Sequence, residues 1–297
     1  FLREMEFNKL LGRAISFYGE TENKKIQPSN PKMQSPIINV KGYESITSEK
    51  VLDKWIKILN EQSVIAVDTE TSSLNPLDAD LVGVSFSYAP NKACYIPLAH
   101  KNIKGLKKEI VLKKIKPILE DPSIKKVGQN IKFDFIILKQ NNIEINPIED
   151  TMLISYTLDA GTNRHNLDTL SEIHLSHKTI SYKELVGTGK NKLNFSDVAL
   201  DKATEYAAED ADVTLRLYNY LKARLDEEKL NKVYETFEKP MVKLLSKLEF
   251  NGIKVDDIYL KKLSKNFEGK LKKIEKEIYS IAGKEFNIAS PKQLGEI

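Results

Sequence analysis

The stretch SVIAVDTE, residues 63–70, decides the fold class together with the two runs that follow it, LVGVSFSY (81–88) and ACYIPL (93–98). Each run is short and rich in β-branched and aromatic residues, which is typical of β-strands. Because so few residues separate the three runs, we expect an antiparallel meander and not parallel strands joined by helical crossovers. The single cysteine, Cys94, falls in the third run and is expected to be a buried strand residue, not a nucleophile.

Beyond the meander the pattern changes from strand to helix. Helical periodicity covers residues 109–119, a brief strand pattern lies near 124–128, and a second helix pattern covers 131–140. From about residue 150 onward nearly everything is expected to be helical. Strands early and helices later predict an α/β domain, with a mixed sheet flanked by helices.

Two further stretches lie outside this domain. Residues 19–39 are rich in Asn, Lys, Gln and Pro, follow a short apolar-periodic stretch, and have the composition of a linker. A second change comes near residue 229, after which two long amphipathic helices are expected, with a break at Asn251-Gly252. Leu271, Ile274, Ile278 and Ile281 form the apolar stripe of the second helix.

The composition is that of a globular protein, with 41% hydrophobic and 30% charged residues among 297. No apolar run approaches the roughly 18–20 residues that span a bilayer. One cysteine excludes an internal disulfide and indicates a reducing compartment. The net charge of +4 is compatible with a nucleic-acid partner without establishing one. Lysines cluster between residues 101 and 132, either as a solvated face or as contacts to phosphate.

Acidic residues occur at three places where apolar ones are expected. In the first, Asp68 and Glu70 follow the apolar half of the first strand and project to the same side, while Thr69 points away. Two neighbouring carboxylates on one strand face repel each other unless a cation lies between them. The alternative is a polar strand end that runs into a turn.

The second place is GQNIKFD, residues 128–134. Asn130 is a candidate N-cap, which puts Asp134 in the first turn of the following helix. An acid there is also favoured by the helix dipole, so this segment by itself leaves a structural role open.

The third place is TEYAAEDADVTL, residues 204–215. Asp210 lies on the apolar stripe of a helix, one turn after Tyr206, whereas Glu209 and Asp212 are expected on its solvated flanks. A carboxylate that faces a core is costly unless it is paired or binds metal. No Lys or Arg lies one turn away on the same face, which disfavours a local salt bridge.

Four acids therefore form a candidate metal cage: Asp68, Glu70, Asp134 and Asp210. Oxygen-only ligands favour Mg²⁺ or Mn²⁺ over zinc. The four histidines show no metalloprotease spacing, and neither a P-loop nor a GxSxG nucleophile motif occurs.

DTETSSL (68–74), GQNIKFD (128–134) and YAAEDAD (206–212) resemble the three exonuclease motifs of the proofreading domain of family A bacterial DNA polymerases. That domain belongs to the tyrosine subgroup of the DEDD exonucleases. RHNLDTL (164–170), HKTISYKELVGTGK (177–190) and FEKPMVKLLSKLEFNGIKVD (237–256) are also similar to these polymerases.

The resemblance implies a ribonuclease H-like fold and a layout in three parts. Residues 1–40 would be a junction and linker, 41–228 the 3′-5′ exonuclease domain, and 229–297 the beginning of the polymerase domain, at the thumb helices. The motifs of the palm and fingers are absent from this sequence, so the chain is not expected to synthesise DNA by itself.

The same resemblance implies phosphodiester hydrolysis with two divalent cations, Mg²⁺ or Mn²⁺. Asp68, Glu70 and Asp210 would hold the cation on the side of the nucleophile, and Asp68 would share the second with Asp134. Tyr206 would orient the attacking water beside Glu70.

For the substrate, the resemblance implies that Leu74 wedges against the terminal base and that Tyr182 stacks near it. The alternative for Leu74 is a loop residue in a core. Gln129 and Asn130 would contact the terminal nucleotide, and Arg164 a phosphate.

The implied partners are a single-stranded or frayed 3′ end of DNA and the rest of a polymerase chain. We expect a monomer without a membrane partner, in a bacterial cytoplasm and associated with the nucleoid. Two alternatives remain. A ribonuclease D-like enzyme would act on RNA, and an inactive exonuclease fold would only bind DNA; the thumb-like tail disfavours the first, and the complete set of acids the second.

Overall fold

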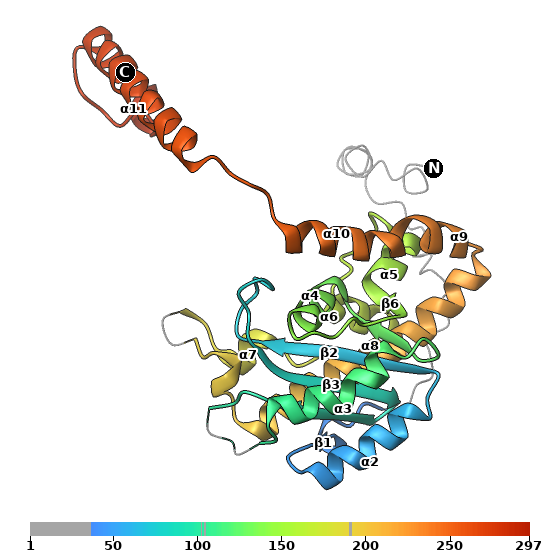
Figure 1. The fold of residues 1–297 in the computed structure, drawn as a ribbon. Helices are drawn as coiled ribbons and strands as arrows, with labels where there is room; N and C mark the ends of the chain where they lie inside the picture. Colours follow the sequence, from blue (N-terminus) through green and yellow to red (C-terminus); the bar gives the residue numbers. More distant parts are fainter. Residues whose placement is uncertain (1–36, 102, 104, 190–191) are drawn as a thin grey trace. The chain divides into compact units, whose positions relative to one another are not determined.

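A six-stranded mixed sheet with the order β1-β4-β3-β2-β5-β6 forms the centre of the fold (Figure 1). The computed structural model describes residues 37–297 except 102, 104, 190 and 191, so the expected N-terminal helix and most of the linker lie outside the described residues. The strands are β1 (Glu44–Ser45), β2 (Val64–Thr71), β3 (Leu81–Ala89), β4 (Lys92–Pro97), β5 (Lys125–Gly128) and β6 (Ile148–Asp150).

The expected meander is confirmed, because β2 pairs with β3 and β3 with β4, both antiparallel. The other three strands pair in parallel: β1 with β4, and β5 and β6 in succession on the free side of β2. The predicted α/β class with a mixed sheet is therefore correct, and Cys94 is fully buried in β4 as expected.

Helices of the first unit, which ends at Phe250, flank this sheet. The first group comprises η1 (Val40–Gly42), α2 (Glu49–Asn60), α3 (Lys108–Glu120), α4 (Lys132–Gln140), α5 (Thr151–Asp159), α6 (Leu167–Leu170), η2 (Ser171–Leu175), α7 (Tyr182–Val186), η4 (Phe195–Asp197) and α8 (Leu200–Glu227). The later helices are α9 (Asn231–Val233), η5 (Tyr234–Glu238), α10 (Lys239–Asn251), α11 (Asp257–Ala282) and α12 (Pro291–Gly295).

The alternation of side chains along β2 assigns a different set of helices to each face of the sheet. Ile65 and Val67 share an apolar core with residues of α2, α3 and α4. Ala66 points the other way and packs against Ala211 and Leu215 of α8. Since side chains two residues apart share a face, the next even-numbered residues of β2 also project toward α8.

The chain divides into two compact units, the second comprising Asn251–Ile297. Residues 231–250 belong with the first unit: the fully buried Tyr234 hydroxyl contacts Glu149 at 3.0 Å, and Lys239 pairs with the same carboxylate at 3.0 Å. In the second unit, by contrast, α11 and α12 bury no side chain. In the expected apolar stripe of α11, Leu271, Ile274 and Ile281 are exposed and Ile278 is partly buried.

Candidate active site

Three of the four predicted carboxylates meet between β2 and α8. Asp68, Glu70 and Asp210 each place one carboxylate oxygen within 4.8 Å of the other two. Asp68 and Glu70 come from the α8-facing side of β2, as strand alternation predicts, and Asp210 projects toward them from the helix. Glu70 is only 7% exposed. Acids far apart in the sequence thus form one cluster.

Asp134 joins this cluster from the first turn of α4. Its Oδ1 accepts hydrogen bonds from the backbone N–H of Thr69, at 2.9 Å, and from the Thr69 hydroxyl, at 2.5 Å. Thr69 points away from Asp68 and Glu70, as predicted. Its two hydrogen bonds hold the Asp134 carboxylate against β2. The carboxylate of Asp134 is 3% exposed and lies close enough to Asp68 and Glu70 for their charges to interact.

The surroundings of the four carboxyl groups disfavour their ionised forms, so all four pKa values are raised. Burial raises the pKa of Asp68 to about 6. Burial, and then the charges of Asp68, Asp210 and Asp134, raise the pKa of Glu70 well above its usual range. The pKa values of Asp134 and Asp210 are raised for the same reasons, burial first and the Asp68 charge second. Within the described residues, no Lys, Arg or His is among the main causes that act on these four pKa values.

This donor set fits divalent cations. The ligands are oxygen atoms alone, as Mg²⁺ and Mn²⁺ prefer. Repulsion among buried carboxylates without a basic partner is relieved when a cation lies between them. The observed cluster therefore satisfies the chemistry that the sequence predicted for a divalent-metal site.

Tyr206 lies one turn before Asp210 on α8, and its phenol is close enough to Asp210, Glu70 and Asp68 for their charges to act on it. Burial, and then the charges of Asp210, Glu70 and Asp68, raise the pKa of Tyr206 well above its usual range. The phenol therefore stays protonated at neutral pH and remains a hydrogen-bond donor beside the acids.

Aromatic rings adjoin Tyr206 on one side of the cluster. The Tyr182 ring lies 6.0 Å from the Tyr206 ring and is stacked on Phe195 at 6.5 Å. Burial, and then the Glu70 charge, raise the pKa of Tyr182, which places its phenol near the acids. A flat aromatic surface at the edge of a metal site suits a nucleobase.

The strand that carries two of the acids is shaped by its neighbours. The pairing of β2 with β3 shifts register between Glu70 and Thr71, and such irregularities re-aim side chains next to active sites. Gly83 lies opposite Glu70, and a Cβ atom there would come within 2.0 Å of the Tyr95 hydroxyl. A glycine is therefore required for Tyr95 to lie across β3.

Comparison with known proteins shows the family of the chain. The family model described as a 3′-5′ exonuclease of family A DNA polymerases matches residues 43–226. The chain belongs to this exonuclease family. It is also 44% identical over 276 residues to DNA polymerase I of Rhizobium leguminosarum, with 86% of this chain and 27% of the relative covered. The chain thus spans about a quarter of that relative's length.

Two solved structures share the ribonuclease H-like fold of this chain. The POL domain of Pol1 from M. smegmatis, in complex with a DNA primer-template and dNTP, superposes with a TM-score of 0.68 at 21% identity, over 84% of this chain and 39% of that one. Brucella melitensis NrnC with bound Mg²⁺ gives a TM-score of 0.52 at 23% identity, over 71% of this chain and 92% of that one. The predicted fold class is confirmed.

The residues expected to contact substrate lie in different environments around the exonuclease site. Leu74 is 85% exposed in the loop after β2, so the alternative of a core residue is wrong. Asn130 and Arg164 are exposed. The Gln129 side chain, however, is engaged within the protein: its amide donates to the His165 carbonyl at 2.7 Å and accepts from the Thr151 hydroxyl at 2.5 Å.

Asn130 is not the N-cap that the sequence suggested. Ile131 occupies that position, and Asn130 adopts a left-handed backbone with φ of 59°. The turn is organised instead by Asp150, which is 2% exposed and accepts hydrogen bonds from the N–H groups of Asn130, at 3.1 Å, and Ile131, at 3.0 Å. A carboxylate at the end of β6 replaces the local cap, and such a long-range contact leaves no signal in the local sequence.

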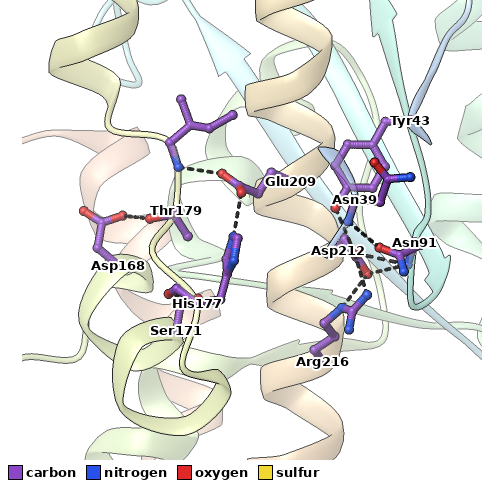
Figure 2. Close-up of polar contacts among 11 residues, drawn as sticks. Asn39, Tyr43, Asn91, Asp168, Ser171, His177, Thr179, Glu209, Asp212 and Arg216 are labelled. Carbon is purple, nitrogen blue, oxygen red and sulfur yellow. Dashed lines mark hydrogen bonds and ion pairs between the residues drawn. The ribbon is translucent and has the colours of Figure 1, made fainter. Parts of the chain in front are cut away.

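Two acids expected on solvated flanks of α8 are buried, so that expectation was wrong. Glu209 is 1% exposed and Asp212 is fully buried. The reason is that α8 is covered on more than one side: by the sheet, by the segment after η2, and by the segment around Tyr43 (Figure 2). The run of small residues at Ala207, Ala208 and Ala211 is the signal of such close packing.

Each of these buried acids has its own partners. Asp212 pairs with Arg216 through Nε and Nη2, both at 3.1 Å, and accepts from the Tyr43 hydroxyl at 2.8 Å. Glu209 points to the other side of the helix, toward His177 (Figure 2). The sequence contained a sign of the first pair, since Arg216 follows Asp212 by one helical turn.

The described lysines between residues 101 and 132 do not form one free basic face. Lys126 is fully buried and donates to two backbone carbonyls. Lys114 pairs with Asp53 at 2.5 Å, Lys101 with Asp197 at 2.7 Å, and Lys132 with Glu249. Contacts from the remaining lysines to phosphate stay a prediction. No helix in the described part of the chain combines the length and apolar character that crossing a bilayer requires.

Proposed function

We propose that this chain removes nucleotides from the 3′ end of DNA by hydrolysing the terminal phosphodiester bond, with release of nucleoside monophosphates. The observation that carries the proposal is the cluster of Asp68, Glu70 and Asp210 near Tyr206, with Asp134 held to the same strand through Thr69. These are the side chains that the exonuclease motifs implicate, and no ion pair to these acids is present within the described residues.

We assign two divalent cations, Mg²⁺ or Mn²⁺, to the four carboxylates. Asp68, Glu70 and Asp210 would hold one of them, and Asp68 and Asp134 the other. When bound, the cations supply a nucleophile at neutral pH and stabilise charge on the attacking and leaving oxygens. Thr69 fixes the Asp134 carboxylate in advance, so that less ordering is needed when a cation binds.

Tyr206 would orient the attacking water. Its phenol stays protonated and lies near Asp210 and Glu70, so it can donate to a water while Glu70 accepts from it. Leu74 would wedge against the terminal base and Tyr182 would stack beside it. Asn130, Gln129 and Arg164 would contact the terminal nucleotide and a phosphate, with the Gln129 amide leaving its present partners.

The preferred substrate is a single-stranded or frayed 3′ end, because stacking and backbone contacts read little sequence and a mismatched end unpairs more easily. As part of a polymerase, the exonuclease would proofread. We place the functional boundary near residue 229, assign 229–297 to the start of the polymerase domain, and expect a monomer in a bacterial cytoplasm, at the nucleoid.

The test is digestion of a 5′-labelled single-stranded DNA oligonucleotide with Mg²⁺ and with EDTA. We expect a ladder of products shortened one nucleotide at a time, which EDTA abolishes and which Asp68→Ala and Asp210→Ala both lose. Full activity in both variants would refute the site. An RNA oligonucleotide of the same sequence tests the ribonuclease D-like alternative, and binding without cleavage by the wild type would favour the inactive module.

A further inference from the structure

Glu209 is a buried acid that the proposed reaction does not use. It immediately precedes Asp210 on α8 and is 1% exposed, yet both of its oxygens serve one neighbouring segment (Figure 2). Its Oε1 lies 2.7 Å from His177 Nε2, and its Oε2 accepts from the backbone N–H of Ile180 at 2.6 Å. Glu209 thus joins the helix of the active site to the segment of residues 176–181, which we call the anchor segment.

The anchor segment is held on its other side by residues that come just before it in the chain. The Ser171 hydroxyl donates to the His177 carbonyl at 2.8 Å, and the Thr179 hydroxyl donates to Asp168 at 2.6 Å. These bonds fix the segment to α6 and η2. The bonds from Glu209 fix it to α8, which carries Asp210 and Tyr206.

The anchor segment leads directly into α7, and the first residue of that helix is Tyr182. Tyr182 follows the Ile180 N–H by only two residues, so the Glu209–Ile180 bond restricts where the Tyr182 ring can lie. That ring contacts Tyr206 with a centroid distance of 6.0 Å and stacks on Phe195. A shift of the anchor segment would therefore move the aromatic surface beside the acid cluster.

The burial of Glu209 has a cost that an apolar residue would avoid. A second carboxylate next to Asp210 must be desolvated, and its charge, after burial and Asp68, adds to the causes that raise the pKa of Asp210. Both Glu209 oxygens bind the anchor segment. We therefore attribute the burial of this carboxylate to the need to hold the anchor segment in a fixed position against α8.

We propose that Glu209 is a positioning residue that holds Tyr182 beside the acid cluster, and that it sets the affinity for the 3′-terminal nucleotide through Tyr182. This inference rests on the proposed exonuclease function and adds to it a residue that touches neither cation nor substrate.

The test is a double-mutant cycle between Glu209 and Tyr182 on single-stranded DNA with Mg²⁺. We expect Glu209→Ala to raise KM about tenfold, the size of one lost base–aromatic stack, with a smaller change in kcat. In a Tyr182→Ala background the same substitution should have no further effect, because interacting residues are not additive. Additive losses, or a fall in kcat with KM unchanged, would overturn the proposal.

Three control variants distinguish a specific effect of Glu209 from a general effect on α8 or on folding. Glu205→Ala removes another glutamate of α8, paired with Lys202 at the surface, and should leave KM unchanged. Glu209→Gln keeps an acceptor for the Ile180 N–H and should restore most of the affinity. If Glu209→Ala fails to fold, His177→Ala removes one partner of Glu209 at a half-buried position, and should raise KM a few-fold only when Tyr182 is present.

Hydrogen–deuterium exchange separates this inference from the proposed function. Amides of residues 176–182 should exchange faster in Glu209→Ala than in the wild type, and unchanged exchange there would overturn the anchoring. A wild-type protein that fails to digest DNA would defeat the proposed function, while the exchange experiment would still decide whether Glu209 holds the segment.

Discussion

Asp210 and Asp212 lie two residues apart on α8, but Asp212 is paired with a basic residue and Asp210 lies among other acids. Asp212 is buried against a basic partner, with two bonds to Arg216 at 3.1 Å and others from Tyr43 and the Asn91 N–H. Asp210 faces Asp68 and Glu70. A buried acid whose counter-charge is supplied by the protein stabilises the fold, whereas one surrounded by acids requires a cation from outside.

The largest difference should appear when Asp210 is changed to Asn. We expect hydrolysis to fall on the order of a thousandfold, because metal-assisted stabilisation contributes several kcal/mol and each 1.4 kcal/mol is about tenfold. The metal-free protein should become more stable, since burial and the Asp68 charge, which raise the pKa of Asp210, disfavour its charged form. Single-turnover digestion and urea denaturation measure the two effects. A loss of stability in Asp210→Asn would contradict the claim that Asp210, unlike Asp212, does not stabilise the metal-free fold.

Asp212→Ala should have the opposite profile. Removing one partner of a buried ion pair costs about 3–5 kcal/mol, and the lost carboxylate also accepts from Tyr43 and Asn91. The fluorescence of Trp55, the single tryptophan, reports unfolding in urea. The fraction that remains folded should still bind Mg²⁺. A variant as stable as the wild type would show that the pair contributes nothing to the fold.

Tyr206→Phe should sharpen the comparison within the site. Loss of the hydroxyl removes one donor aimed at the reacting water, for which roughly a hundredfold fall in kcat is expected. The ring still packs beside Tyr182, so the affinity for single-stranded DNA should be unchanged. Fluorescence anisotropy with Ca²⁺ in place of Mg²⁺ measures binding, and an equal loss of affinity would contradict the role of Tyr206 in chemistry.

A smaller effect concerns pH. The pKa of Asp68 is raised from 3.8 to about 6, so its contribution to the stability of the metal-free protein is present below about pH 4 and is lost as pH rises through 6. Cations need the deprotonated form. Stabilisation by Mg²⁺ should therefore be larger at pH 8 than at pH 5. At pH 5, one unit below the pKa of Asp68, the cation must displace a proton from this carboxyl group, which costs about 1.4 kcal/mol. Thermal unfolding with and without Mg²⁺ tests the sign.

The same contrast explains which features the sequence could predict. Alternation placed Asp68 and Glu70 on one face of β2, and the helical period placed Asp210 one turn after Tyr206, because both depend on local geometry. The partners of Glu209, Asp150 and Asp212 depend on segments brought together by the fold. The prediction from the apolar stripe assumed that α8 has one buried face. Because α8 is covered on several sides, the acids on its flanks are buried and not solvated as predicted.

The most direct test of the account is to locate Mn²⁺ by anomalous diffraction, in crystals of the chain soaked with Mn²⁺ and a nucleoside monophosphate. We predict two peaks, one against Asp68, Glu70 and Asp210 and the other against Asp68 and Asp134. Peaks elsewhere, or no peak among these carboxylates at a concentration that supports hydrolysis, would contradict the claim that the four acids form a cation-dependent nuclease site.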